Sequence, residues 1–155
     1  MTARCCPRLD PAEWDKLFWV WDKKPFYAAR FWSIFNLPLT LDSAIRKAVQ
    51  DIESRGVGDE EPLLFQRDEA MLHSTLLVSI KKYVDDLPVE TVSGRFYSRL
   101  FEGKYSDSGR FAKEVNSDLK LRGLSQVELM FYYPTCADCL MKRGVGQVVV
   151  FARVK

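Results

Sequence analysis

The sequence contains two similar segments, and this internal repeat limits the folds open to the chain more than any other feature. Residues 51–56 read Asp-Ile-Glu-Ser-Arg-Gly, and residues 118–123, 67 positions later, read Asp-Leu-Lys-Leu-Arg-Gly. The acidic, apolar, arginine and glycine positions agree in register. Each segment ends a stretch with helical periodicity. The chain is therefore predicted to contain one local unit twice.

Apolar residues recur at helical spacing up to each repeated segment. In residues 40–56 one helical face collects Leu41, Ile45, Ala48, Val49 and Ile52. In residues 106–123 the corresponding face collects Phe111, Val115 and Leu119. Thr40 or Asp42 is expected to cap the first helix and Ser106 or Asp107 the second, because these side chains accept hydrogen bonds from the first helical turn.

Runs typical of strands surround each helix in the same order. The first half predicts strands at residues 26–35, 63–66 and 72–82, and the second at 92–101, 127–133 and 147–154. The order strand-helix-strand-strand thus occurs twice, in halves 26–82 and 89–155. We predict an α+β fold in which both βαββ repeats form one mostly antiparallel sheet layer with the helices on one face.

Residues 1–25 form a segment with no counterpart in the second half. Trp14, Phe18, Trp19 and Trp21 make it strongly apolar. So many exposed rings would form an adhesive patch, and we expect this amino-terminal extension to pack on the body at residues 26–155. A short helix or turn is predicted to begin at residues 10–13, Asp-Pro-Ala-Glu.

The charge distribution argues against nucleic acid as a partner. The chain has 23 basic and 21 acidic residues, a formal charge of +2, and both signs are interspersed. No extended basic surface that would bind phosphate backbones is expected. The apolar runs are far shorter than the ~20 residues of a membrane-spanning helix, and the amino terminus has no run of signal-peptide length. We expect a cytoplasmic protein without membrane partners.

One part of the second half resembles a known family. Residues 93–105 read Ser-Gly-Arg-Phe-Tyr-Ser-Arg-Leu-Phe-Glu-Gly-Lys-Tyr and lead into the second helix. This resembles the strand, turn and helix of GyrI-like proteins, although Lys104 stands where that family commonly has proline. The Phe-Tyr-Tyr-Pro strand end at residues 131–134 and the apolar last strand are also similar. The resemblance covers residues 26–155.

The resemblance implies a stand-alone domain with a small-molecule pocket. The GyrI-like family includes effector-binding domains of multidrug-responsive transcription regulators, an antagonist of DNA gyrase, and hydrolases of strained, cyclopropane-containing toxins. Many members place a glutamate near the start of the last strand, whereas residues 147–153 of this chain contain no acid. Glu128, on the preceding strand, is the nearest acidic candidate. The alternative interpretation of Glu128 is a solvated strand residue.

Candidate site residues lie on the predicted strands. A small-ligand pocket is usually concave and apolar with a few polar groups. The rings assigned to it are Trp32, Tyr97, Tyr132, Tyr133 and Phe151, and core packing explains each equally well. The candidate catalytic residues are Glu128 and His73, the only histidine; a structural or exposed position is the alternative for His73. No covalent-nucleophile motif is present, so a carboxylate or ordered hydroxyl groups are expected to activate water if the protein is an enzyme.

Four cysteines form two pairs in the sequence. Cys136 and Cys139 form a Cys-x-x-Cys, and Cys5 and Cys6 are adjacent. The first pair resembles the knuckle of a zinc ribbon. A structural zinc ion bound by all four thiolates is one hypothesis, a redox pair is a second, and free thiols in a reducing cytosol are the third. No other cofactor is indicated.

Three functions follow from these features. The first is binding of a small hydrophobic or cationic organic compound, for sequestration, sensing or detoxification. The second is hydrolysis of a strained or activated small molecule of the cyclopropane type. The third is inhibition of a protein partner through an exposed edge or loop. The sequence leaves the ligand and the oligomeric state open.

Overall fold

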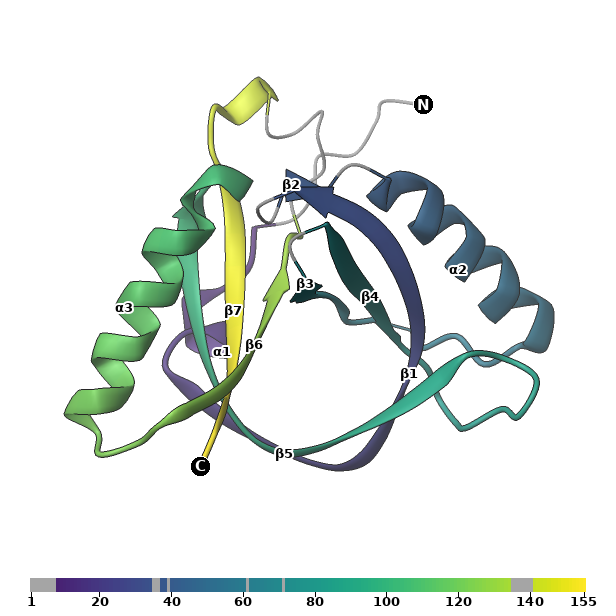
Figure 1. Ribbon diagram of the computed structural model, residues 1–155, viewed down its shortest axis with the longest axis horizontal. Coiled ribbons are helices and arrows are strands. Elements are labelled where there is room, and N and C mark those ends of the chain that lie inside the picture. The colour runs from purple at the N-terminus through teal and green to yellow at the C-terminus, as the bar shows by residue number, and fades with distance from the viewer. Residues whose placement is uncertain (1–7, 35–36, 39, 61, 71, 135–140) are drawn as a thin grey trace. The chain divides into compact units, whose positions relative to one another are not determined.

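The computed structural model describes residues 8–34, 37–38, 40–60, 62–70, 72–134 and 141–155 (Figure 1). The chain divides into two compact units, Met1–Trp19 with Arg95–Lys155 (unit 1) and Val20–Gly94 (unit 2). The helices and strands, in chain order, are α1 (Pro11–Trp14), β1 (Leu17–Ile34), β2 (Leu37–Pro38), α2 (Leu41–Arg55), β3 (Leu64–Ala70), β4 (His73–Ser79), β5 (Val89–Gly103), the 3-10 helix η1 (Tyr105–Asp107), α3 (Ser108–Leu121), β6 (Gln126–Tyr132) and β7 (Gly146–Val154).

Unit 2 contains an antiparallel sheet and the helix α2. Strand β4 pairs with β1 on one side and with β3 on the other. Residues of the sheet, of α2 and of the segments that follow α2 and β4 pack in one buried cluster: Tyr27, Phe31, Ala48, Ile52, Val57, Leu76, Val78 and Ile80. The helix lies along β1 and β4 in Figure 1. It ends at Gly56, whose left-handed conformation (φ +64°) turns the chain back toward the sheet.

Unit 1 repeats this plan with α3. Strand β7 lies between β5 and β6 and pairs antiparallel with both. Alternate residues of the three strands point to α3, which lies along β6 and β7 (Figure 1). They form a second buried cluster with the helix: Tyr97, Phe101, Phe111, Val115, Leu119, Phe131, Val148, Val150 and Ala152.

The helical periodicity predicted which residues of α3 are buried. Phe111, Val115 and Leu119 are fully buried, and in α2 the same holds for Ala48. The predicted caps are present only by position. Thr40 and Asp107 precede the helices without a side-chain hydrogen bond to them. The Thr40 hydroxyl accepts instead from the Trp32 amide at 3.0 Å, and the Asp107 carboxylate accepts from the Lys104 amide at 2.9 Å.

The predicted α+β fold class, with one sheet layer and both helices on one face, is wrong. Strand makes up 47% and helix 29% of the structure, and each unit has its own helix. The strands predicted at residues 26–35 and 92–101 belong, over residues 26–34 and 92–101, to β1 and β5. These two strands have 18 and 15 residues, pair with each other and enter both units.

The sequence does not reveal the length of β1 because its middle does not read as a strand. Residues 22–25 are Asp-Lys-Lys-Pro, which interrupts the alternation. The structure accommodates them with a local irregularity. Lys23 has a positive φ of 51°, and its amide donates to the Ser93 hydroxyl of β5 at 2.8 Å. The strand therefore continues through a polar segment that sequence patterns assign to a loop.

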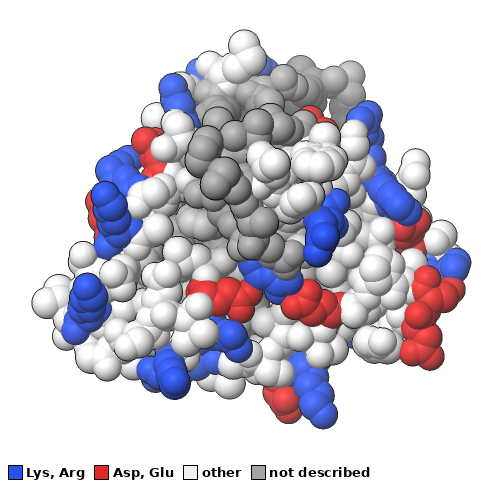
Figure 2. All heavy atoms as spheres, in the orientation of Figure 1, with Lys and Arg blue, Asp and Glu red and all other residues white. Residues whose placement is uncertain are grey.

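On the face shown in Figure 2, basic and acidic side chains occur side by side. Among the described helices, none has the length and apolar character needed to cross a membrane.

Candidate active site

The sheet of unit 1 has a second face, which points away from α3 and carries aromatic rings. Strand pairing puts Ser98 of β5 beside Phe151 of β7, and Phe151 beside Met130 of β6. The end of α1 and the start of β1 each add one tryptophan, Trp14 and Trp19, to this face. We call it the aromatic face and define it by four rings: Trp14, Trp19, Tyr132 and Phe151.

The four rings are in mutual contact. The centroid of Trp14 lies 5.8 Å from Trp19 and 5.6 Å from Tyr132, and Trp19 lies 5.4 Å from Phe151. These separations are typical of favourable aromatic pairs. Phe151 is fully buried, whereas the other three are half-buried. Each of those three therefore retains surface that a ligand could cover.

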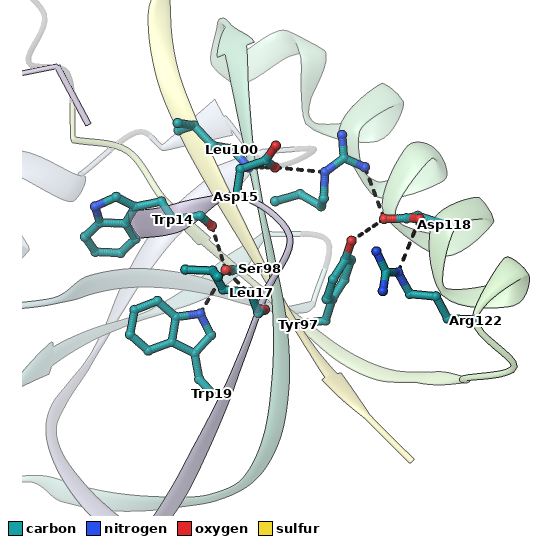
Figure 3. Close-up of polar contacts among 10 residues, drawn as sticks. Trp14, Asp15, Leu17, Trp19, Tyr97, Ser98, Leu100, Asp118 and Arg122 are labelled. Carbon is teal, nitrogen blue, oxygen red and sulfur yellow. Dashed lines mark hydrogen bonds and ion pairs between the residues drawn. The ribbon is translucent and has the colours of Figure 1, made fainter. Parts of the chain in front are cut away.

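A buried serine holds both tryptophans. Figure 3 shows Trp14 and Trp19 on the side of β5 opposite Tyr97 and α3. The Ser98 hydroxyl accepts from Trp19 Nε1 at 2.8 Å and donates to the Trp14 carbonyl oxygen at 2.6 Å. The turn between the rings is tight, since Lys16 has a φ of 57° and its amide donates to the Ser98 carbonyl at 2.8 Å.

Substitution of Ser98 by alanine is expected to loosen the aromatic face. The change leaves Trp19 Nε1 without this acceptor and is expected to cost about 1–3 kcal/mol of unfolding free energy. Near-ultraviolet circular dichroism should lose intensity in the tryptophan region. Exposed Ser106, changed to alanine, is the control and should alter neither quantity. An unchanged tryptophan spectrum for Ser98→Ala would show that the hydroxyl does not position the rings.

Charged side chains connect this turn to α3. Asp15 accepts from the Leu100 amide and from Arg99 Nε, both at 2.9 Å. Arg99 Nη1 lies 3.4 Å from Asp118 Oδ2, and Asp118 also accepts from the Tyr97 hydroxyl (Figure 3). Asp15 and Arg99 are less than one quarter exposed. A continuous series of hydrogen bonds and ion pairs therefore connects the turn after Trp14 to α3.

Glu128 lies on the aromatic face, near the rings. It pairs with Arg153, and the next pair on that face is Met130 with Phe151. Successive side chains on one face of a strand are about 7 Å apart, so Glu128 lies one step along this face from the Met130–Phe151 pair and two steps from Tyr132. Its Oε2 lies 3.4 Å from Arg153 Nε, and the Glu128 side chain is 27% exposed. The ion pair orients the carboxylate while part of it contacts solvent.

The other predicted site residues lie elsewhere. Tyr97 is fully buried under α3, and Tyr133 stacks on Phe131 beside the same core, with ring centroids 6.2 Å apart. Trp32 and His73 lie in unit 2, where their rings are 4.6 Å apart and Trp32 is 54% exposed. Of the predicted set, Glu128, Tyr132 and Phe151 share one face of the sheet of unit 1.

The proposed zinc ligands Cys5, Cys6, Cys136 and Cys139 lie outside the described residues. Within the described part of the chain, no group of three or more histidine, cysteine or acidic side chains is arranged to hold a metal ion. The zinc hypothesis therefore stays a prediction.

The sequence interpretation did not assign Trp14, Trp19 and Ser98 to a site. The tryptophans were recognised only as rings that needed cover. Their assignment depends on the sharp turn at Lys16 and on the partner of Ser98, which are tertiary features. The visible signal was the alternation of β5, which separates Ser98 from Tyr97 and Arg99.

Both units contain the same contact between a strand tyrosine and a helix aspartate. Tyr97 donates to Asp118 in unit 1, and Tyr27 donates to Asp51 in unit 2 at 2.5 Å. Burial and the aspartate raise the pKa of Tyr97 to about 12, and the same causes raise the pKa of Tyr27. The Tyr27 hydrogen bond, with Lys47, lowers the pKa of Asp51.

The pKa of Asp118 is also lowered. Burial alone would raise it, but the Tyr97 hydrogen bond and the charges of Arg122 and Arg99 outweigh burial. Between the folded and unfolded pKa values of an aspartate with a lowered pKa, the folded state binds fewer protons than the unfolded state. The stabilisation is therefore present above the unfolded value of about 3.9 and is lost as the pH falls through the folded value.

We accordingly expect the free energy of unfolding to decrease steeply below about pH 4. The double variant Asp51→Asn/Asp118→Asn should be less stable at neutral pH and should show a shallower decrease. Urea unfolding at a series of pH values measures both slopes. Equal acid slopes for the two proteins would mean that these two carboxylates do not carry the effect.

The comparisons with known proteins concern the whole chain. A family model described as bacterial hydrolase matches residues 1–154. A search of curated proteins found no significant match. The GyrI-like resemblance is not confirmed, because the matching family is a different one. Since the match extends over nearly the full length, the chain belongs to the bacterial hydrolase family.

Proposed function

We propose that the protein is a hydrolase that adds water to a small, flat, largely apolar organic molecule with a strained or otherwise activated bond. One observation carries this proposal: half-buried Glu128 lies on the same sheet face as four contacting aromatic rings, in a member of a hydrolase family. Binding for sequestration or sensing would need the rings but no neighbouring carboxylate. The position of Glu128 and membership of a hydrolase family therefore both favour hydrolysis over binding alone.

The rings supply binding. Trp14, Trp19 and Tyr132 are half-buried, so a planar ligand placed against them removes apolar surface from water on both partners. Each 100 Å² of apolar surface covered contributes roughly 2.5 kcal/mol before the costs of association. Ser98 limits these costs, because it fixes two of the rings before the ligand arrives.

Glu128 supplies proton transfer. Its carboxylate takes a proton from a water molecule as the water oxygen bonds to the electrophilic carbon of the substrate. In a three-membered carbon ring next to a carbonyl, the ring carbon–carbon bond breaks, and its electron pair moves to the carbonyl oxygen as an enolate. Glu128 then returns the proton to the enolate carbon. The net change is addition of one water molecule, with no oxidant or reductant.

The proposal is tested by incubating the protein with a panel of flat compounds that carry strained rings, activated esters or lactones. Mass spectrometry identifies ring-opened products heavier than the substrate by one water molecule, or, for an open-chain ester, an acid and an alcohol whose masses together exceed that of the substrate by one water molecule. Quenching of tryptophan emission identifies binding. Enzymatic formation of such a product supports hydrolysis. Quenching without any product across the panel would favour binding alone.

A further inference from the structure

A pocket of about 560 Å³ lies in unit 2, beside α2 and apart from the aromatic face. The Tyr27–Asp51 contact forms part of its wall. Lys47 Nζ approaches Asp51 Oδ2 at 3.0 Å from the solvent side, with its side chain 72% exposed. The wall also includes the apolar residues Ala29, Ala44, Leu87 and Pro88. The pocket thus combines a carboxylate with apolar surface.

Unit 1 shows how the corresponding place is filled. Tyr27 and Asp51 correspond to Tyr97 and Asp118, because the strand sequences Phe26-Tyr27 and Phe96-Tyr97 align 70 positions apart and the helix segments 67 apart. In this alignment Ala29 corresponds to Arg99. Both follow the tyrosine by two residues and therefore share its face of the strand.

The guanidinium of Arg99 occupies the space over the tyrosine–aspartate contact in unit 1. Its Nη1 lies 3.4 Å from Asp118 Oδ2. Arg122 adds a second guanidinium, with Nε 3.5 Å from Asp118 Oδ1 and its central carbon 5.0 Å from the centroid of the Tyr97 ring (Figure 3). An aromatic ring completes the cover, since Phe18 lies 4.9 Å from Tyr97.

In the described part of unit 2, neither guanidinium has an equivalent over the tyrosine–aspartate contact. Alanine at position 29 provides no guanidinium, and Arg55, the counterpart of Arg122, is directed to Asp86, with Nε 2.6 Å from Asp86 Oδ2. We propose that the pocket beside α2 binds an organic cation that carries a guanidinium or amino group on a short apolar chain. The cationic group contacts Asp51, and the chain covers Ala44, Leu87 and Pro88.

The charged residues that line the pocket are three basic ones, Arg30, Lys47 and Arg55, and two acidic ones, Asp51 and Asp86. Arg30 follows Ala29 and therefore belongs to the opposite face of β1. Lys47 is the side chain that a ligand cation would replace at Asp51, and its ion pair is largely exposed. Exposed pairs of this kind contribute little to stability, so their replacement costs little. Arg55 stays engaged by Asp86 at 2.5 Å from Nη2, which limits its repulsion of the incoming cation.

Three probes of similar size test the charge requirement: butylguanidinium, the uncharged butylurea, and butyrate. Binding is followed by the chemical shifts of the backbone amides of residues 27–30 and 47–55 in a nuclear magnetic resonance titration of the full chain. Butylguanidinium should bind with millimolar affinity, as expected for a fragment with one charge-assisted contact. Butylurea should bind at least about tenfold more weakly, and butyrate should not bind at these residues.

Two variants test the geometry. Asp51→Asn should weaken butylguanidinium binding by at least about tenfold, whereas Asp42→Asn, which removes an exposed carboxylate from the same helix outside the pocket, should leave it unchanged. Ala29→Arg should abolish binding by restoring the internal guanidinium. Equal binding by wild type and Asp51→Asn, or preference for butyrate, would overturn the proposal even if Ala29→Arg failed to fold. Hydrolysis at the aromatic face is unaffected by either result.

Discussion

Glu128→Gln is expected to lower kcat by about 100- to 10,000-fold, the usual contribution of a positioned general base. Glutamine keeps the size of the side chain but cannot accept the proton of the attacking water. Because the four rings remain in place, KM for the same substrate should change little. Steady-state kinetics with a compound identified in the hydrolysis screen separates these two quantities.

Glu114→Gln is the matched control for this change. Glu114 lies on α3, is 49% exposed, and is paired only loosely with Arg110, at 4.0 Å. Its substitution removes the same charge at a distance from the aromatic face and should leave kcat unchanged. If Glu128→Gln retains wild-type kcat while its thermal unfolding is normal, Glu128 has no part in proton transfer.

Phe111→Ala is expected to destabilise the protein by about 3–5 kcal/mol. The ring is fully buried and stacks on Phe101, with centroids 4.5 Å apart and planes inclined by 12°. Its removal leaves a cavity between α3 and the sheet of unit 1. The remaining ring, Phe101, cannot fill this cavity unless the helix moves. A decrease in Tm of at least about 6 °C should result for a chain of this length.

Leu121→Ala is the control on the same helix, because Leu121 is 88% exposed and should change Tm by about 1 °C at most. Differential scanning calorimetry gives both values. A small effect for Phe111→Ala would mean that the core under α3 repacks around the missing ring, and the account of α3 as the helix that supports unit 1 would fail.

The sequence contains enough information to locate the helices and most strands, since periodicity is a local property. Phe111, Val115 and Leu119 are buried together, as their spacing predicts. The arrangement of the strands is not local. Length and pairing of β1 depend on residues 22–25, whose polar composition hides a strand that is completed by a hydrogen bond between Lys23 and Ser93.

The candidate site shows the same division. Alternation along β6 predicts that Glu128 and Tyr132 share one face, but which face carries other rings depends on the position of α3. Tyr97 illustrates the difficulty, because an aromatic residue on a strand can equally line a site or fill a core. Its hydroxyl partner, Asp118, lies on a helix 21 residues away, and no strand pattern identifies that partner.

The internal repeat was more informative than any single motif. In the sequence, Asp51 and Asp118 are only equivalent positions of the repeat. In the structure, each accepts a hydrogen bond from the equivalent tyrosine of its own unit. The difference between the copies, alanine at position 29 and arginine at position 99, suggests a ligand for one of them. The difference can be interpreted only when the surroundings of both tyrosine–aspartate contacts are compared.

The central claim is that the aromatic face of unit 1 directs water onto a small molecule through Glu128. The most direct test is turnover in water enriched in heavy oxygen, with wild type and Glu128→Gln compared by mass spectrometry of the product. We predict one heavy oxygen atom in the wild-type product and almost no product from the variant. Wild-type protein that forms no water-addition product, or equal incorporation by both proteins, would contradict the claim.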